Sequence, residues 1–274
     1  LVEVGACLRR GRIGGGRFGI PGGVQHGRAV AYRATHHVIH RHAVDAIAIA
    51  LEHAFPVQDQ FHQAEVQVHL GAGPQVSQTS GRTFKNSSST AIVTLSAGRL
   101  SLETTAYSHF AEFRELMLLC CRAVVGAGVT PALQRVGLRY IDEIRVPDDA
   151  VRDARRWDRW IDPRLVGHLT IGPQTAQVQQ AEGVVTYRLA EGSGLNVRFA
   201  SLPRGAVVSP AALVRHAFDA NLPLFVLDFD GYREFVGPDA TLMSEEVIAR
   251  TLDAVHAPTG EAFQASITEE ARQL

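Results

Sequence analysis

The chain has 274 residues, of which 46% are hydrophobic and 20% charged, a composition that predicts a soluble globular protein with a sizeable core. Its formal net charge of -1 excludes the general basic footprint of proteins that bind nucleic acids or anionic membranes. No run of about 18 apolar residues is present, which excludes a transmembrane helix.

Residues 1–42 are an atypical segment rich in glycine, arginine and histidine. Gly14, Gly16 and Gly19 have the G-x-G-x-x-G spacing of a dinucleotide-binding loop, whose glycines let backbone N–H groups approach a pyrophosphate. The apolar strand and the helix that should flank such a loop are missing, because "CLRRGRI" is a poor buried strand and Pro21 blocks a helix. We interpret the segment as flexible or poorly packed, and we predict no cofactor.

Four histidines lie at the end of this segment: His36, His37, His40 and His42. His36 and His40 would share one face of a helix and could chelate zinc. The zinc-protease motif requires a glutamate directly after the first histidine, where this chain has His37. A solvated segment is therefore favoured, and a metal site at His36, His40 and His42 is the alternative.

Residues 43–146 are predicted to form a first α+β module. Residues 43–55 have the apolar spacing of a helix that ends before Pro56, and residues 65–70 alternate as a strand does. Residues 77–90 are rich in Ser, Thr and Gly, which predicts a turn or an exposed loop.

A hairpin is expected over residues 91–107, because apolar and polar residues alternate on both sides of Ala97-Gly98. We expect its apolar side to consist of Ile92, Leu95, Leu100 and Leu102.

Ser108 is the expected N-cap of an amphipathic helix that ends at Gly126 and packs on the hairpin. Residues 133–146 then return to a period of two and are expected to join the same sheet. One face of that strand carries Val136, Leu138 and Tyr140, and the other carries Arg135, Gly137, Arg139 and Ile141.

Residues 147–166 are polar and are predicted to connect two modules. Trp157 and Trp160 have helical spacing next to Arg155 and Arg156, and aromatic rings interleaved with arginine can stack on bases and hold phosphates. A connecting helix with both tryptophans packed against the protein is the favoured interpretation.

Residues 167–274 are predicted to form a second module. Ser244 should cap a helix, and a separate last helix should follow Pro258. Strands followed by a helix, twice, predict an α+β fold of two similar modules and suggest an internal duplication. The candidate strands are 168–171, 174–180, 184–189, 196–200 and 224–229, with a short helix at 210–220.

Asp228 and Asp230 in "LFVLDFDGY" resemble the first motif of haloacid-dehalogenase-type phosphatases. In that family the first aspartate attacks phosphorus, the second is the general acid and base, and both help to hold magnesium. Tyr232 stands where the motif has threonine, and residues 231–274 are too few to supply the rest of that fold. Outward-facing aspartates on a sheet are the favoured interpretation.

Glu103, Thr104 and Arg139 are polar residues on predicted central strands, where a charge must be paired or face a ligand. An ion pair between Arg139 and Glu103 across strands is one expectation. The other is a ligand-binding face that includes Asp228 and Asp230.

The three cysteines, Cys7, Cys120 and Cys121, are too few for a disulfide framework. No signal-peptide pattern is recognised. We expect a reducing, cytoplasmic location.

Three stretches, "RLSLETTAYSHFAEF" at 99–113, "RVGLRYIDEI" at 135–144 and "LDAVHAPTGEAFQASITEEAR" at 252–272, resemble a sporadically distributed family of uncharacterised bacterial proteins of about this length. The resemblance runs from about residue 43 to the C-terminus. It implies the architecture and a patchy distribution of the kind seen for genes of mobile elements or defence loci, but no catalytic residues.

We therefore expect a binding or interaction protein rather than an enzyme, with an unidentified protein or small molecule as its partner. The alternatives are a metal-dependent phosphohydrolase or nuclease and a nucleic-acid-binding module, although the net charge argues against nucleic acid.

Overall fold

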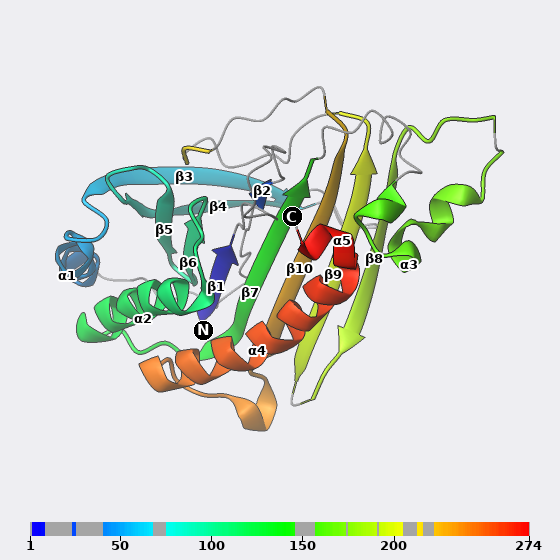
Figure 1. The fold of residues 1–274 in the computed structure, drawn as a ribbon. Helices are drawn as coiled ribbons and strands as arrows, with labels where there is room; N and C mark the ends of the chain where they lie inside the picture. Colours follow the sequence, from blue (N-terminus) through cyan, green and yellow to red (C-terminus); the bar gives the residue numbers. More distant parts are fainter. Residues whose placement is uncertain are drawn as a thin grey trace.

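The computed structural model describes residues 2–8, 24–25, 41–67, 75–145, 157–173, 175–190, 192–204, 213–215 and 222–273. These residues form an α+β protein with one curved β-sheet and helices on one of its faces (Figure 1). The elements in chain order are β1 (Val2–Leu8), β2 (Val24–Gln25), α1 (Arg41–Leu51), β3 (Val57–Gln67), β4 (Gln75–Lys85), β5 (Ala91–Ser96), β6 (Arg99–Thr104), α2 (Phe110–Gly126), β7 (Leu133–Ile144), η2 (Trp157–Arg159), α3 (Pro163–Val166), η3 (Gly167–Thr170), β8 (Ala181–Arg188), β9 (Ser193–Leu202), β10 (Leu224–Glu234), η4 (Gly237–Asp239), α4 (Glu245–Ser266) and α5 (Glu269–Arg272).

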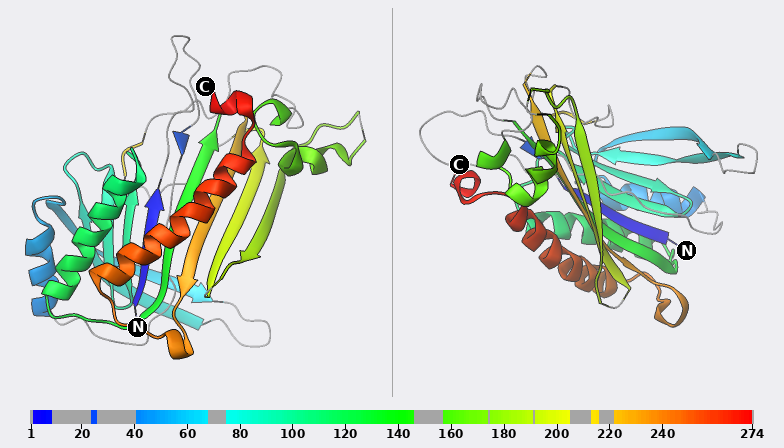
Figure 2. Two further views of the ribbon diagram at one scale, coloured as in Figure 1. Left: turned by 60° about the horizontal axis from the view of Figure 1, so that its bottom comes forward. Right: turned by 90° about the vertical axis from the view of Figure 1, so that its right-hand side faces the viewer.

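The strands lie in the order β3-β4-β5-β6-β1-β7-β10-β9-β8, and β2 pairs with β7. β1 runs parallel to its neighbours β6 and β7, and the other described pairs are antiparallel. The sheet twists so strongly that β3 and β4 run across the direction of β8 and β9 (Figures 1 and 2). It therefore contains two antiparallel groups of strands, joined through β1.

Each group of strands is followed by a helix, so the two predicted strand-and-helix modules are confirmed. α2 follows β3 to β6, and α4 follows β8 to β10 and crosses β10, β7 and β9 (Figure 2). The groups differ in one respect, because four consecutive strands precede α2 and three precede α4. They also differ in direction, because β6 runs parallel to its neighbour β1, whereas β10 runs antiparallel to its neighbour β7.

The core lies between this sheet and its helices. As predicted, α2 ends at Gly126 and directs Phe113, Met117 and Val124 into the core, together with both of its cysteines. α4 packs tightly against β10 at Gly231, where an added Cβ would lie 2.5 Å from Thr259 Oγ1. Only glycine leaves room for the helix at this point.

The predicted hairpin and the strand after α2 are confirmed as β5, β6 and β7. Within the hairpin one assignment was wrong, because Ile92 pairs with Glu103 on the face away from the helices, and Val93 is the residue that lies beside Leu95 on the helix side. Ile92 is nevertheless buried. The N-cap is also displaced by one residue: His109 accepts a hydrogen bond from the Glu112 amide, and Ser108 donates to the Glu112 carboxylate.

The largest error in the first half concerns residues 77–90, which were predicted as a loop. Residues 75–85 form β4, which pairs with β3 on one side and with β5 on the other. Two partner strands satisfy its backbone hydrogen bonds, and this outweighs the low strand propensity of its serines and glycine. β3 likewise begins at Val57, before the predicted strand at 65–70, of which residues 68–70 lie outside the described part.

In the second half two predicted strands are wrong. Residues 168–170 lie in the 3-10 helix η3, whose buried Leu169 supplied the apolar signal, and Ile171 follows its end. The described residues of 174–180 form no strand. Of the predicted helix at 210–220 only residues 213–215 are described, and they are not helical. The predicted strands near 184–189, 196–200 and 224–229 are present as β8, β9 and β10.

The predicted break at Pro258 is also wrong, because α4 continues through it to Ser266. Val255 and Phe263 lie on either side of the proline and are both buried, so continuing the helix keeps both in the core. Ser244 caps α4 as predicted, accepting a hydrogen bond from the Val247 amide at 3.3 Å.

None of the described helices is long and apolar enough to cross a membrane.

Candidate functional site

The alternation of β10 separates its apolar residues from its two aspartates. Phe229 lies edge-to-face with Phe263 of α4, at 6.1 Å between ring centroids. Asp228 and Asp230 have the opposite parity and therefore lie on the face of the sheet that α4 does not cover. The neighbouring positions on that face carry Arg139 of β7 and Arg198 of β9.

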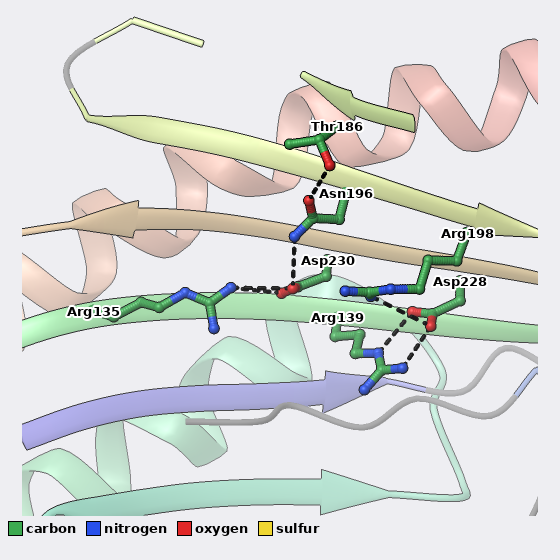
Figure 3. Close-up of polar contacts among 7 residues, drawn as sticks. All are labelled: Arg135, Arg139, Thr186, Asn196, Arg198, Asp228 and Asp230. Atoms are coloured by element: carbon green, nitrogen blue, oxygen red, sulfur yellow. Dashed lines mark hydrogen bonds and ion pairs between the residues drawn. The ribbon is translucent and has the colours of Figure 1, made fainter. Parts of the chain in front are cut away.

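Seven polar residues from four adjacent strands meet there, and we call this set the charged face (Figure 3). Its members are Arg135, Arg139, Thr186, Asn196, Arg198, Asp228 and Asp230.

One row of the charged face places a carboxylate between two arginines. Arg139 Nε donates to Asp228 Oδ1 at 2.7 Å, and Arg139 Nη2 donates to the other carboxylate oxygen. Arg198 Nη1 lies 3.6 Å from Asp228 Oδ2. The side chain of Asp228 is only 8% exposed, so the bidentate bond with Arg139 compensates a charge that has lost most of its hydration.

The second row is a chain of hydrogen bonds across the strands. Arg135 Nη2 donates to both oxygens of Asp230, at 3.2 and 3.1 Å, and its guanidinium lies 4.3 Å from the centroid of the Tyr232 ring. Asn196 Nδ2 donates to Asp230 at 3.2 Å, while its Oδ1 accepts from Thr186 Oγ1 at 2.9 Å. Each polar group has a partner, which holds Asp230 and Asn196 in one orientation.

The two rows differ in charge. Asp230 and Arg135 neutralise each other, whereas the single charge of Asp228 faces both Arg139 and Arg198. The Arg198 side chain is 43% exposed, and within the described part of the chain its guanidinium makes no hydrogen bond, since 3.6 Å exceeds hydrogen-bond distance. An exposed guanidinium with its donors available binds carboxylate or phosphate groups well.

Further along β7, the same face carries a buried ion pair. Arg145 Nε donates to Glu143 Oε1 at 2.8 Å, and Arg145 Nη1 donates to the carbonyl of Leu222 at 3.0 Å. Burial lowers the pKa of Arg215, while the negative charge of Glu143 opposes that change. Both members of the pair are almost fully buried, so this end has a structural role.

Of the residues predicted from the sequence, Arg139, Asp228 and Asp230 are brought together. Glu103 lies on the same face, but the strand β1 lies between its strand and β7, so the ion pair between Arg139 and Glu103 across strands stays a prediction. Arg139 binds Asp228. Thr104 has the opposite parity; its hydroxyl donates to Thr90 O at 3.2 Å and accepts from the Ala106 amide at 3.1 Å.

The phosphatase-like motif is not placed as that chemistry requires. Asp228 and Asp230 lie in the middle of β10, which continues to Glu234 without the loop that would present them to a substrate. Both carboxylates are held by arginines. Among the residues that the structure describes, no group of three His, Cys, Asp or Glu side chains could hold a metal ion.

The remaining candidate sites are separated from the charged face or lie outside the described residues. Trp157 and Trp160 are buried, Trp157 with its ring centroid 5.5 Å from that of Phe225, so neither can stack on a base as it stands. His42 is exposed on α1. His36, His37 and His40, the glycines of the proposed dinucleotide loop, Arg155 and Arg156 lie outside the described part of the chain.

Asn196 and Arg198 were not among the site residues predicted from the sequence. The signal was present, because both alternate in "LNVRFA" with Leu195, Val197 and Phe199. Their importance depends on β9 lying next to β10 with Arg198 opposite Asp228, a register that a single sequence does not reveal.

Comparison with protein-family models, curated proteins and solved structures finds no match to this chain.

Proposed function

We propose that the protein is a binding or interaction protein that holds an anionic group, a carboxylate or a phosphate, at Arg198 on the charged face. The observation that carries the proposal is the sharing of Asp228 by two arginines. Arg139 takes up both carboxylate oxygens, so the guanidinium of Arg198 is half exposed and makes no hydrogen bond within the described residues. An anionic ligand would supply those bonds.

The neighbouring residues support recognition rather than catalysis. Asp228 and Asp230 already accept hydrogen bonds from arginines at both carboxylate oxygens, so these oxygens are engaged within the protein and are not directed at a substrate. Asn196 is fixed by Asp230 on one side and Thr186 on the other. The charged face is therefore a rigid surface with one available cationic group.

The test measures binding through the thermal stability of the purified protein. Inorganic phosphate and succinate are compared with sodium chloride at equal ionic strength. A ligand present at ten times its Kd raises the free energy of unfolding by about 1.4 kcal/mol, and for a chain of this length 1 kcal/mol corresponds to a rise in Tm of about 2 °C. We expect a rise of roughly 2 to 3 °C with at least one of the two anions.

Arg198→Ala should abolish that rise. Arg250→Ala is the matched control, because Arg250 is an exposed arginine on α4 whose pair with Glu246 is also long, at 3.8 Å. An anion effect that is absent from the wild type, or equal in the two variants, would overturn the proposal. Turnover of a phosphate ester with added Mg²⁺, lost in Asp228→Asn, would support the phosphohydrolase alternative instead.

The bacterial origin, the cytoplasmic location, the internal duplication and the association with mobile-element or defence loci stay predictions from the sequence. The two strand-and-helix modules support the duplication as far as their order of elements agrees. Binding of nucleic acid through the two tryptophans is disfavoured, because both rings are buried.

A further inference from the structure

The strand β8 forms one end of the sheet, and the right-hand view of Figure 2 looks at the molecule from this side. Within the described residues β8 is hydrogen-bonded to β9 alone, so one side of its backbone has no partner strand. Val184 is 62% exposed and Tyr187 is 49% exposed, and Val185 is also exposed. An uncovered edge strand that exposes valines and a tyrosine is a site for pairing with another strand.

The hydrogen-bond pattern of β8 defines which residues face outward. The amide of Leu189 donates to Ser193 O at 2.9 Å, which continues the antiparallel pairing of β8 with β9. Odd-numbered residues therefore direct their N–H and C=O groups toward β9, and even-numbered residues direct theirs away from the sheet. The outward-directed residues are Glu182, Val184, Thr186 and Arg188.

We propose that β8 pairs with β8 of a second copy of this chain, antiparallel and around a twofold axis at Val185. In this register Glu182 lies opposite the partner's Arg188, and Val184 lies opposite the partner's Thr186. These are the residues whose backbone groups point outward, so the register forms about eight backbone hydrogen bonds. It also keeps the helix-covered faces of both sheets on the same side.

The side chains of β8 are complementary to themselves in this register. Glu182 and Arg188 are exposed, and neither makes an ion pair within the described residues, yet each would meet its opposite charge across the twofold axis, twice per dimer. A shift of the register by two residues would lose both of these pairs.

On the helix side of β8, Tyr187 would lie opposite the partner's Gly183. The Phe199 ring lies over Gly183 and fills the space that a side chain would occupy there, because a Cβ added at Gly183 would collide with this ring. Tyr187 would therefore meet an aromatic ring across the interface, and Val185 would meet its own copy on the axis. This arrangement covers apolar side chains that are otherwise exposed to water.

Analytical ultracentrifugation of the wild-type protein from about 1 to 100 µM tests the proposal. We expect a concentration-dependent dimer. Glu182→Arg and Arg188→Glu should each weaken it at least tenfold in Kd, because each places like charges opposite each other. The double variant carrying both changes should restore the dimer. Glu246→Arg, a charge reversal at an exposed side chain of α4, should leave it unchanged.

Val184→Pro separates edge pairing from folding. The backbone N–H of Val184 points away from β9, so proline at this position removes a hydrogen bond to the second copy but none to β9. We expect a folded monomer, with the circular dichroism spectrum of the wild type. A wild-type protein that stays monomeric at every concentration overturns the proposal, even if its β8 edge binds a foreign peptide. A dimer that persists in Val184→Pro and in the single charge reversals also overturns it.

Discussion

The bond between Arg139 and Asp228 offers the clearest test of how the charged face is held together. Replacing Asp228 by asparagine keeps the size of the side chain but removes the charge that faces Arg139 and Arg198. Breaking a buried ion pair by removing one partner costs about 3 to 5 kcal/mol, because a charge is left in a poorly solvated position. Arg139 retains some exposure, so we expect the lower end, about 3 kcal/mol.

For a domain of this length 3 kcal/mol corresponds to a decrease in Tm of about 6 °C. Differential scanning calorimetry measures it, and urea titration gives the free energy of unfolding independently. A double-mutant cycle with Arg139→Ala should give a coupling energy of at least about 1 kcal/mol, since the two side chains share two hydrogen bonds.

The matched control is Asp253→Asn on α4. Arg114 binds Asp253 with the same bidentate geometry, at 2.8 and 3.1 Å, but the Asp253 side chain is 51% exposed. Water screens this pair, so its loss should cost less than about 1 kcal/mol. The reasoning fails if Asp228→Asn destabilises the protein no more than Asp253→Asn does, because burial would then not determine the strength of the pair.

Two further predictions concern the packing of α4 and the thiols of α2. Gly231→Ala should lower the free energy of unfolding by about 1 to 3 kcal/mol in urea titrations, since its Cβ would lie 2.5 Å from Thr259 Oγ1. Gly260→Ala should raise it by up to about 1 kcal/mol, because no atom lies within 4 Å of the added Cβ and alanine favours the helix. Burial raises the pKa of Cys121 to about 12 and that of Cys120 above its ordinary range. Above about pH 9 these thiols ionise only in the unfolded chain, so the unfolded state binds fewer protons and stability falls as pH rises, by up to about 1.4 kcal/mol per pH unit for each thiol. Replacing both cysteines by alanine should reduce that slope between about pH 9 and 10.5, and an unchanged slope would show that the thiols are not protected by burial.

The parts of the fold that the sequence predicted correctly depend on local chemistry. The three- and four-residue spacing of apolar side chains specified α2, and Ser244 with its following glutamates specified the start of α4. The turn at Ala97-Gly98 and the alternation around it specified the hairpin of β5 and β6. In each case residues close together in the chain provide the stabilising contacts, so one sequence contains enough information.

The candidate site was only half predictable for the same reason. The alternation of β7 and β10 separated Arg139 and Asp228 from the apolar residues, and that required no knowledge of the neighbours. The pairing partner of Arg139 depended on β1 entering the sheet between β6 and β7, so that β6 is not adjacent to β7. Arg198 was missed because its position opposite Asp228 is set by the register of β9.

The sequence by itself determined the α+β class, the faces of the central strands and the start of α4, because periodicity, turns and caps act over a few residues. The tertiary structure alone decided that residues 75–85 form a strand, that α4 continues through Pro258, and that Asp228 lies between two arginines. Those outcomes depend on hydrogen bonds and apolar burial between segments far apart in the chain, and these contacts outweigh local propensities of about 1 kcal/mol or less for strand residues.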